Sequence, residues 1–575
     1  MGIKHFFMWF KNQFSEHTHK LNKDQTLESI QVDIDNLMID MNGIFHNSAQ
    51  KIYEYGNHKP PRRLIPSRNI KPRQNSLDMQ LKVFQDICAT VETIFNMTKP
   101  NKRLILCIDG PAPISKQNQQ RQRRFRSAME EMGNCPFNSN SITPGTKFMD
   151  FLSKYIDWFI RKKIVDDPEW NKVQIIMSNE KAPGEGEHKI INYIRFYGNK
   201  EETFCIHGLD ADLIMLALGT HLPKFYILRE DMYDPANDYF CINVGSVHNQ
   251  LVELMRWTSD NYELIPNSTI DDFIFMCFMV GNDFLPHIPS IEIIEDGIEL
   301  MIQVYKDVCT SYGHLTQNID GKVCLIQNSM EAFLGTIGHY EKENFQTKLG
   351  KKSAFFPDPI LEKCAIQTPD GNWTVDIEKY KSDYINTNFE KDYDVEKLCH
   401  EYLEGMQWVL SYYTRGVPNW KWNYKHHYAP PASILSQHLK TFVIPKYGHT
   451  IPSAPFQQLL SVLPPKSASL IPEPLSKLLT DESSPLKEFC PDVFEIDLAG
   501  KRKEWEGIVI LPMVDFNVVR EEYFKVLEKV NPQDIKRNIL GRTFLYEKVY
   551  KYPYLFKSYY GNIENCTVKT ILIDL

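Results

Sequence analysis

Acidic residues at the ends of apolar segments are the part of this sequence best suited to do chemistry. Asp40 closes the apolar run at 36–40, and Asp109 closes another at 103–109. Five further acids lie in turns next to apolar or helical segments: Glu185, Glu187, Asp210, Asp212 and Asp283. Carboxylates buried beside apolar strands are costly unless a positive group compensates for the lost water. The pattern therefore predicts a site where cations meet these seven acids.

The spacing of the paired acids favours magnesium. Glu185 and Glu187 are two residues apart, as are Asp210 and Asp212, and on a regular helix such neighbours point to opposite sides. In a glycine-flanked turn they can converge on one pocket. We predict that all seven acids are catalytic metal ligands for two Mg²⁺ ions about 4 Å apart, with Mn²⁺ able to substitute. Such ions would clamp the attacking and leaving oxygens of a phosphodiester while water attacks.

A structural explanation also exists for each acid taken alone. An aspartate at a strand end is usually a helix N-cap, and a single Asp-x-Asp pair is weak support for a metal. Five clusters at corresponding positions of one predicted sheet favour the metal site for the set as a whole.

Basic residues follow directly after Asp109. In a helix, Lys116, Gln120, Arg123 and Arg124 lie at i, i+4, i+7 and i+8, which places them on one face. Arginine offers a bidentate fork, lysine a point charge and glutamine a neutral donor, a combination suited to a terminal phosphate. The alternative is a solvated basic face, the usual place for a run of charge. The position beside the acids favours the phosphate pocket.

Short apolar runs alternate with helical patterns from residue 30 to about 300. Strands are predicted at 36–40, 103–109, 173–177 and 203–206, and helices at 77–98, 146–163 and 186–196. This alternation predicts an α/β fold with a mainly parallel twisted sheet and helices on both faces. The ligand site of such a sheet lies outside the carboxyl ends of the strands, which is where the acids fall.

The chain divides by its pattern into three parts. We expect a catalytic region over 1–320, a connector over 321–395 and a second region over 396–575. Prolines between 445 and 490 predict an extended segment rather than a helix. The basic, proline-punctuated segment 59–73 is predicted to be a solvated loop, with contact to RNA as the alternative.

Composition limits the functional classes. The 575 residues are 42% hydrophobic and 24% charged, as in folded proteins, and the net charge of −8 excludes a uniformly basic surface for nucleic acid. Twelve cysteines without a C-x-x-C pair predict reduced thiols, and a zinc site from distant residues is the alternative. No stretch approaches the roughly 18 apolar residues of a membrane span. We expect a soluble cytoplasmic protein, with the nucleus left open.

Motifs along the whole chain resemble the XRN-type 5′→3′ exoribonucleases. The resembling segments are 40–47, 108–128, 141–146, 183–188, 208–213, 281–286, 407–410, 412–413, 415–416, 420–422, 427–430, 462–465 and 494–511. They cover both core regions of that family, from Met1 to near the C-terminus. The chain stops soon after the second region, so it is similar to a compact member without a long C-terminal extension.

The resemblance implies a fold, an activity and several roles. It implies a flap-nuclease-like (PIN) core and a Mg²⁺-dependent enzyme that degrades single-stranded RNA processively from a 5′-monophosphate, releasing 5′-mononucleotides. The seven acids match the family's metal ligands, and the basic helix face matches its 5′-phosphate pocket. His46 and Trp408 match residues that stack on the terminal base. The family's second region encloses the active site and excludes capped ends; we expect a monomer.

Two other functions stay open at this point. A flap-type DNA nuclease would share the acids at strand ends, although the basic helix and the aromatic second region argue against it. A catalytically inactive RNA-binding scaffold is the non-enzymatic alternative. All seven matched acids are present, whereas a decayed site would be expected to have lost some.

Overall fold

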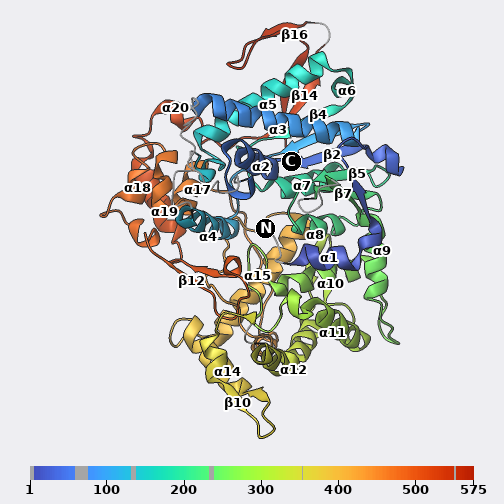
Figure 1. The fold of residues 1–575 in the computed structure, drawn as a ribbon, viewed down its shortest axis with the longest axis vertical. Helices are drawn as coiled ribbons and strands as arrows, with labels where there is room; N and C mark the ends of the chain where they lie inside the picture. Colours follow the sequence, from blue (N-terminus) through green and yellow to red (C-terminus); the bar gives the residue numbers. More distant parts are fainter. Residues whose placement is uncertain are drawn as a thin grey trace, which may run out of the picture.

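The computed structural model describes most of the chain (Figure 1). The described residues are 5–58, 76–130, 137–231, 238–351, 354–549 and 552–574. The basic loop predicted at 59–73 lies outside them. Within the described ranges, no helix is both long enough and apolar enough to cross a membrane.

A mixed sheet lies at the centre of the molecule. Among the described residues it has nine strands in the order β1-β7-β6-β5-β2-β3-β4-β14-β17. The middle strands run parallel: β6 (Phe225–Glu230), β5 (Phe204–His207), β2 (Asn36–Asp40), β3 (Arg103–Cys107) and β4 (Gln174–Ser178). The strands at the two edges are antiparallel: β1 (Thr18–Leu21), β7 (Tyr239–Asn243), β14 (Thr543–Lys548) and β17 (Val568–Ile573). The predicted α/β fold and its parallel centre are confirmed.

Alternate residues of each central strand enter two different cores. In β2, Leu37 and Ile39 pack into one core and Met38 into the other. This follows because successive side chains of a strand point to opposite faces. Helices α2 (Met41–Tyr53), α3 (Ser76–Thr98) and α5 (Lys147–Asp166) cover the first face. Helices α7 (Gly186–Tyr197), α8 (Asp212–Leu218), α9 (Val244–Leu254) and α10 (Pro266–Cys277) cover the second. Helices α3, α5 and α7 confirm the three that were predicted at 77–98, 146–163 and 186–196.

The rest of the chain is mainly helical; in the view of Figure 1, α17, α18 and α19 lie to the left of the sheet and α11, α12 and α14 lie below it. The longer helices are α4 (Ile114–Glu130), α11 (Gly297–Tyr312), α12 (Gln327–Gly350), α14 (Ile377–Asn388), α15 (Val395–Arg415) and α19 (Phe516–Leu527). The shorter ones are α1 (Phe6–Gln13), α6 (Pro168–Lys172), α13 (Pro359–Lys363), α16 (Ala432–Gln437), α18 (Lys477–Thr480) and α20 (Pro532–Ile535). Four small antiparallel pairs are β8 (Thr316–Ile319) with β9 (Lys322–Leu325), β10 (Ala365–Gln367) with β11 (Trp373–Val375), β12 (Glu495–Asp497) with β13 (Ile508–Ile510), and β15 (Tyr554–Phe556) with β16 (Ile563–Cys566). The divisions at residues 320 and 395 stay predictions.

The proline-rich segment 445–490 contains a helix that its composition did not predict. Helix α17 (Pro455–Val462) begins with Pro455 in its first turn. Proline is tolerated there because the N–H that it lacks would have no partner within the helix. The expectation of an extended segment was therefore wrong for these residues. Helix α17 packs against α4 and α19 (Figure 1), so the missed helix supports the basic one.

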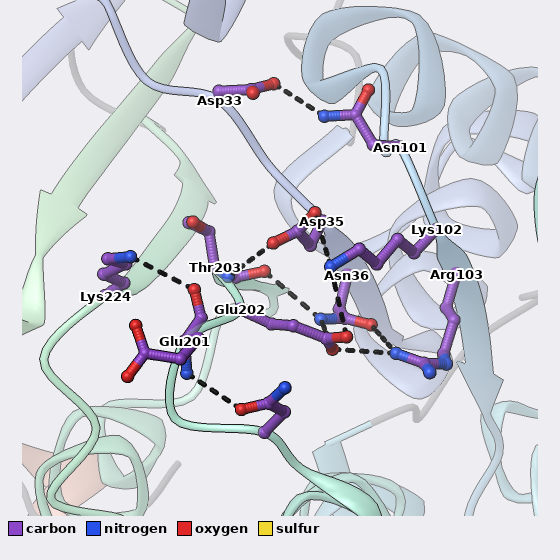
Figure 2. Close-up of polar contacts among 11 residues, drawn as sticks. Asp33, Asp35, Asn36, Asn101, Lys102, Arg103, Glu201, Glu202, Thr203 and Lys224 are labelled. Carbon is purple, nitrogen blue, oxygen red and sulfur yellow. Dashed lines mark hydrogen bonds and ion pairs between the residues drawn. The ribbon is translucent and has the colours of Figure 1, made fainter.

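A polar cluster crosses the amino ends of the central strands (Figure 2). The buried Asn36 side chain donates to Glu202 Oε2 at 2.9 Å, and Arg103 Nη1 donates to the same oxygen at 2.8 Å. Lys102 Nζ lies 3.2 Å from Glu202 Oε1. Although burial raises the pKa of Glu202, the hydrogen bonds from Asn36 and Lys102 bring it below its ordinary value. Both oxygens of this acid are satisfied, as expected of a structural group.

Removing one donor from this cluster should destabilise the fold. Asn36→Leu should lower the free energy of unfolding by about 1–3 kcal/mol, because Glu202 loses a hydrogen bond in a buried place. Asn101→Ala is the control, because its hydrogen bond to Asp33 is exposed and its loss should change stability by less than about 0.5 kcal/mol. Urea denaturation measures both. Equal losses in the two variants would contradict the structural role.

Candidate active site

The seven predicted acids lie together at the carboxyl ends of the central strands. Asp40 is the last residue of β2, and Asp109 lies just beyond β3. The other five lie at the start of α7, at the start of α8 and after α10: Glu185, Glu187, Asp210, Asp212 and Asp283. Carboxylate oxygens of Asp40, Glu187 and Asp210 are within 4.8 Å of one another. Burial and then neighbouring acids raise the pKa values of Asp40, Glu187 and Asp212, and the acids that act on them include Glu185, Asp109, Asp210 and Asp283, so the group forms one electrostatic unit.

A glycine allows the acids of α7 to approach those of β2 and β3. A Cβ atom on Gly186 would lie 2.5 Å from Asp40 Oδ1 and 3.1 Å from the carbonyl oxygen of Cys107. The Gly186 N–H instead donates to Asp109 Oδ1 at 2.7 Å. Any side chain at position 186 would push these acids apart. The Glu-Gly-Glu sequence is thus explained by close packing at the site.

Several carboxylate oxygens in this group are buried without a partner. Asp40 Oδ1, Glu187 Oε2 and Asp212 Oδ1 make no hydrogen bond within the described part of the chain. Burial raises the pKa of Asp40 and of Glu187 well above the ordinary range, and neighbouring acids raise both further. Burial, with Asp210 and Asp283, raises the pKa of Asp212 to about 7. Unsatisfied hard oxygen ligands with this much mutual repulsion fit a divalent cation.

Lys116 joins the basic helix to the acids. Its Nζ lies 2.6 Å from Asp283 Oδ2 and also contacts Glu185. Burial opposes the charge on Lys116, but Asp283 and Glu185 raise its pKa well above the ordinary value. Lys116, the first of the α4 residues predicted to bind phosphate, therefore lies among the acids, whereas it was expected to lie beside them.

The other predicted phosphate ligands lie further along α4. Arg124 donates from Nη1 to Gln120 Oε1 at 3.2 Å and from Nη2 to Thr143 Oγ1 at 2.9 Å. Burial and then Arg123 lower the pKa of Arg124 to about 9. Arg123 is partly exposed and has no hydrogen bond or ion pair with any described residue. The guanidinium group of Arg124 is thus held by hydrogen bonds, whereas that of the neighbouring Arg123 is free to bind a ligand.

His46 lies next to these arginines. Burial, followed by Arg123 and Arg124, lowers the pKa of His46 to about 3. The imidazole is therefore neutral at physiological pH. A neutral flat ring beside a cationic pocket is compatible with the predicted stacking role.

Trp408 does not have the exposure that the resemblance assigned to it. Its side chain is fully buried, and its indole N–H donates to the carbonyl oxygen of Asn419 at 3.0 Å. One ring face stacks on Trp422, with 5.0 Å between ring centroids, and Phe284 and Tyr412 pack around it. No face is open to a base, so the prediction for Trp408 was wrong. The aromatic and apolar residues around it on α15 already indicated a core position.

Trp420 contacts the first turn of α4 through its backbone. Its backbone carbonyl accepts from the N–H of Ile114, the first residue of α4, at 3.0 Å. Its side chain is partly exposed, and its ring stacks on no ring of the described residues. The loop sequence Pro418-Asn419-Trp420-Lys421, without helical periodicity, was the signal that could have separated Trp420 from Trp408.

Tyr412 also contacts the acids and was not predicted. Its hydroxyl donates to Glu185 Oε1 at 2.9 Å, and its ring stacks on His188 with 3.6 Å between centroids. Tyr412 and Glu185 are separated by 227 residues, so no local spacing rule could pair them. The second half of the chain therefore supplies part of the acidic site.

Two family models match this chain. The model described as "XRN 5'-3' exonuclease N-terminus" matches residues 1–231, and "Xrn1 helical domain" matches 265–368 and 376–572. The chain belongs to the XRN 5′-3′ exonuclease family. The matched residues include all seven acids, the basic helix and Tyr412.

Curated members of the XRN family match almost the whole chain. The 5'-3' exoribonuclease 1 of Saccharomyces cerevisiae is 28% identical over 98% of this chain and 46% of its own length. The human protein of that name is 29% identical over 100% of this chain and 37% of its own length. The 5'-3' exoribonuclease 2 homolog of Drosophila melanogaster is 29% identical over 95% of this chain and 73% of its own length. This chain thus spans about half the length of the yeast relative and less of the human one.

A solved structure of the Rad2 catalytic core in complex with a DNA substrate is more remote. It is 12% identical, covers 76% of this chain and 99% of its own, and has a TM-score of 0.29. A likeness this weak has no bearing on function.

The metal-free acids should make stability depend on pH. Folded Asp212 keeps its proton up to about pH 7, whereas an unfolded aspartate loses it near pH 4. The folded state binds more protons between these values, so the free energy of unfolding should fall by up to roughly 4 kcal/mol as pH rises from 4 to 7.

A bound cation should remove this loss. In calorimetry, Mg²⁺ or Mn²⁺ should raise Tm more at pH 7.5 than at pH 5.5, because at the lower pH protons already occupy the acids. Asp212→Asn should flatten the pH dependence measured in EDTA. An equal rise in Tm at both pH values would contradict the cation site.

Proposed function

We propose that this XRN family member is a hydrolytic 5′→3′ exoribonuclease that degrades single-stranded RNA from a 5′-monophosphate and releases 5′-mononucleotides. The observation that carries the proposal is the position of Lys116, which shares a helix with Gln120 and Arg124 and also contacts Glu185 and Asp283. A phosphate held by this helix would place the adjoining phosphodiester at the acids. The curated relatives named exoribonucleases support the same substrate class.

The seven acids are proposed to hold two Mg²⁺ ions, with Mn²⁺ as a substitute. When bound, these ions activate a water and offset the charge that develops on the phosphate. The unpartnered oxygens of Asp40, Glu187 and Asp212 support this assignment. Gly186 keeps the acids close, and Tyr412 holds one oxygen of Glu185.

The basic helix is proposed to measure the 5′ end. The terminal phosphate would be bound by Lys116, Gln120, Arg123 and Arg124. Of the two guanidinium groups, that of Arg123 is the more accessible. The first base would lie between the neutral ring of His46 and Trp420, which takes the place first expected for Trp408. Stacking of this kind does not depend on sequence. We further propose that the chain acts as a monomer in the cytoplasm.

Matched substrates test the proposal. Purified protein with Mg²⁺ should degrade 5′-monophosphate RNA and leave the 5′-triphosphate and capped forms of the same RNA largely intact. Asp210→Ala should abolish cleavage while RNA still binds, and Arg123→Ala should remove the preference for the monophosphate. Preference for flap DNA would favour the DNA nuclease, and RNA binding without turnover would favour the scaffold; either result would overturn the proposal.

The stacking residue can be tested by substitution. Trp420→Ala should raise KM for 5′-monophosphate RNA by about tenfold, since stacking on one base contributes about 1–3 kcal/mol. Trp373→Ala is the control, because this tryptophan is exposed on β11, which pairs with β10 far from α4 (Figure 1). Steady-state kinetics with one RNA decide the matter. An unchanged KM in Trp420→Ala would exclude the role.

A further inference from the structure

A buried glutamine of the second family region contacts the basic helix. Gln458 lies on α17 and is fully buried. Its Oε1 accepts from the backbone N–H of Ala112 at 2.8 Å, and its Nε2 donates to Gln120 Oε1 at 3.1 Å. Gln458 is 338 residues from Gln120, so this contact exists only in the folded chain.

The contacts of Gln458 fix which way its amide points. A backbone N–H can only donate, so the atom of Gln458 that faces Ala112 has to be the oxygen. The nitrogen then faces Gln120 and can only donate, so the atom of Gln120 that it meets has to be the oxygen. Ala112 is itself held, because Gln117 Nε2 donates to its carbonyl oxygen at 2.9 Å. The backbone N–H of Ala112 thus sets the direction of both hydrogen bonds, the one that Gln458 accepts and the one that it donates to Gln120.

Arg124 enforces the same orientation of Gln120. Its Nη1 donates to Gln120 Oε1 at 3.2 Å, so this oxygen receives two donors. Gln120 Nε2 then has to point away from both Gln458 and Arg124. It makes no hydrogen bond with any described residue, and it is not sealed from solvent. The face of Gln120 left for a ligand is therefore a donor.

We propose that Gln458 is a positioning residue that sets the donor polarity of Gln120 and thereby helps the pocket select a 5′-phosphate. The inference rests on the proposed function, since the phosphate is the ligand that the donor would meet. Without Gln458, Arg124 would be the one remaining donor to Gln120 Oε1 among the described residues, so the amide of Gln120 could turn more readily and present its oxygen to the phosphate, where two acceptors repel each other. Gln458 thus acts on recognition through Gln120 and does not touch the substrate.

An isosteric substitution tests this polarity. In Gln458→Glu, one carboxylate oxygen still accepts from Ala112, but the other faces Gln120 with an acceptor and favours the turned amide. KM for 5′-monophosphate RNA should rise by about tenfold, the value of one hydrogen bond to a charged group, with kcat unchanged. KM for 5′-hydroxyl RNA should not change. Gln458→Met removes the donor to Gln120 without putting an acceptor in its place, so it should raise this KM by a smaller factor, about threefold.

Gln457→Glu is the matched control. Gln457 neighbours Gln458 on α17, and its Oε1 also accepts from a backbone N–H, that of Ala454 at 2.9 Å. Because it does not contact Gln120, its substitution should leave both KM values unchanged. A general packing effect would lower Tm and affect both RNAs, whereas loss of polarity affects only the phosphorylated one. Circular dichroism and Tm identify any variant that fails to fold, and Gln458→Met then carries the test.

The outcomes separate the two proposals. If the wild-type protein degrades no RNA, or treats both 5′ ends alike, the proposed function fails and this inference with it. If the wild type prefers the monophosphate and Gln458→Glu and Gln458→Met keep that preference in full, only the inference fails. A double variant with Gln120→Leu should show no added loss from Gln458→Glu, since the effect passes through Gln120.

Discussion

The balance between one group of buried acids and one basic helix is the constraint on which this structure depends. Seven carboxylates meet at the carboxyl ends of parallel strands, and several of their oxygens have no partner among the described residues. Lys116 supplies one positive charge in this group, which is far from enough to neutralise it. The remaining charge is what makes a cation site there, and the arginines further along α4 extend the positive field away from it.

The acids at the two ends of the central sheet differ in their hydrogen-bond partners. At the amino ends, Glu202 receives donors from Asn36, Lys102 and Arg103 on both of its oxygens. At the carboxyl ends, Asp40 and Glu187 keep oxygens that no donor fills. The exposed surface of these side chains is similarly small in the two places. Glu202 lies less deep than Asp40 and Glu187, and it also has the donors that they lack. Buried polar atoms without partners are uncommon, and a cluster of them at one place favours a ligand site there.

The second half of the chain completes the site instead of merely covering it. Tyr412 on α15 donates to Glu185, the backbone of Trp420 contacts the start of α4, and Gln458 on α17 donates to Gln120. Each of these contacts joins residues far apart in sequence. Both family regions therefore contribute to the candidate site, and residues of the second region contact side chains and backbone of the first.

The sequence by itself determined the parts whose signals are local. The alternation of strands and helices, the acids at strand ends and the face shared by Lys116 and Arg124 follow from spacing, because strand and helix geometry repeats along the chain. Only the tertiary structure decided that Trp408 is buried and Trp420 is partly exposed, and that Gln458 contacts Gln120. Exposure and contact depend on which elements pack together, and these elements are hundreds of residues apart in sequence. The proline-rich sequence around helix α17 (Pro455–Val462) did not indicate that it packs against α4.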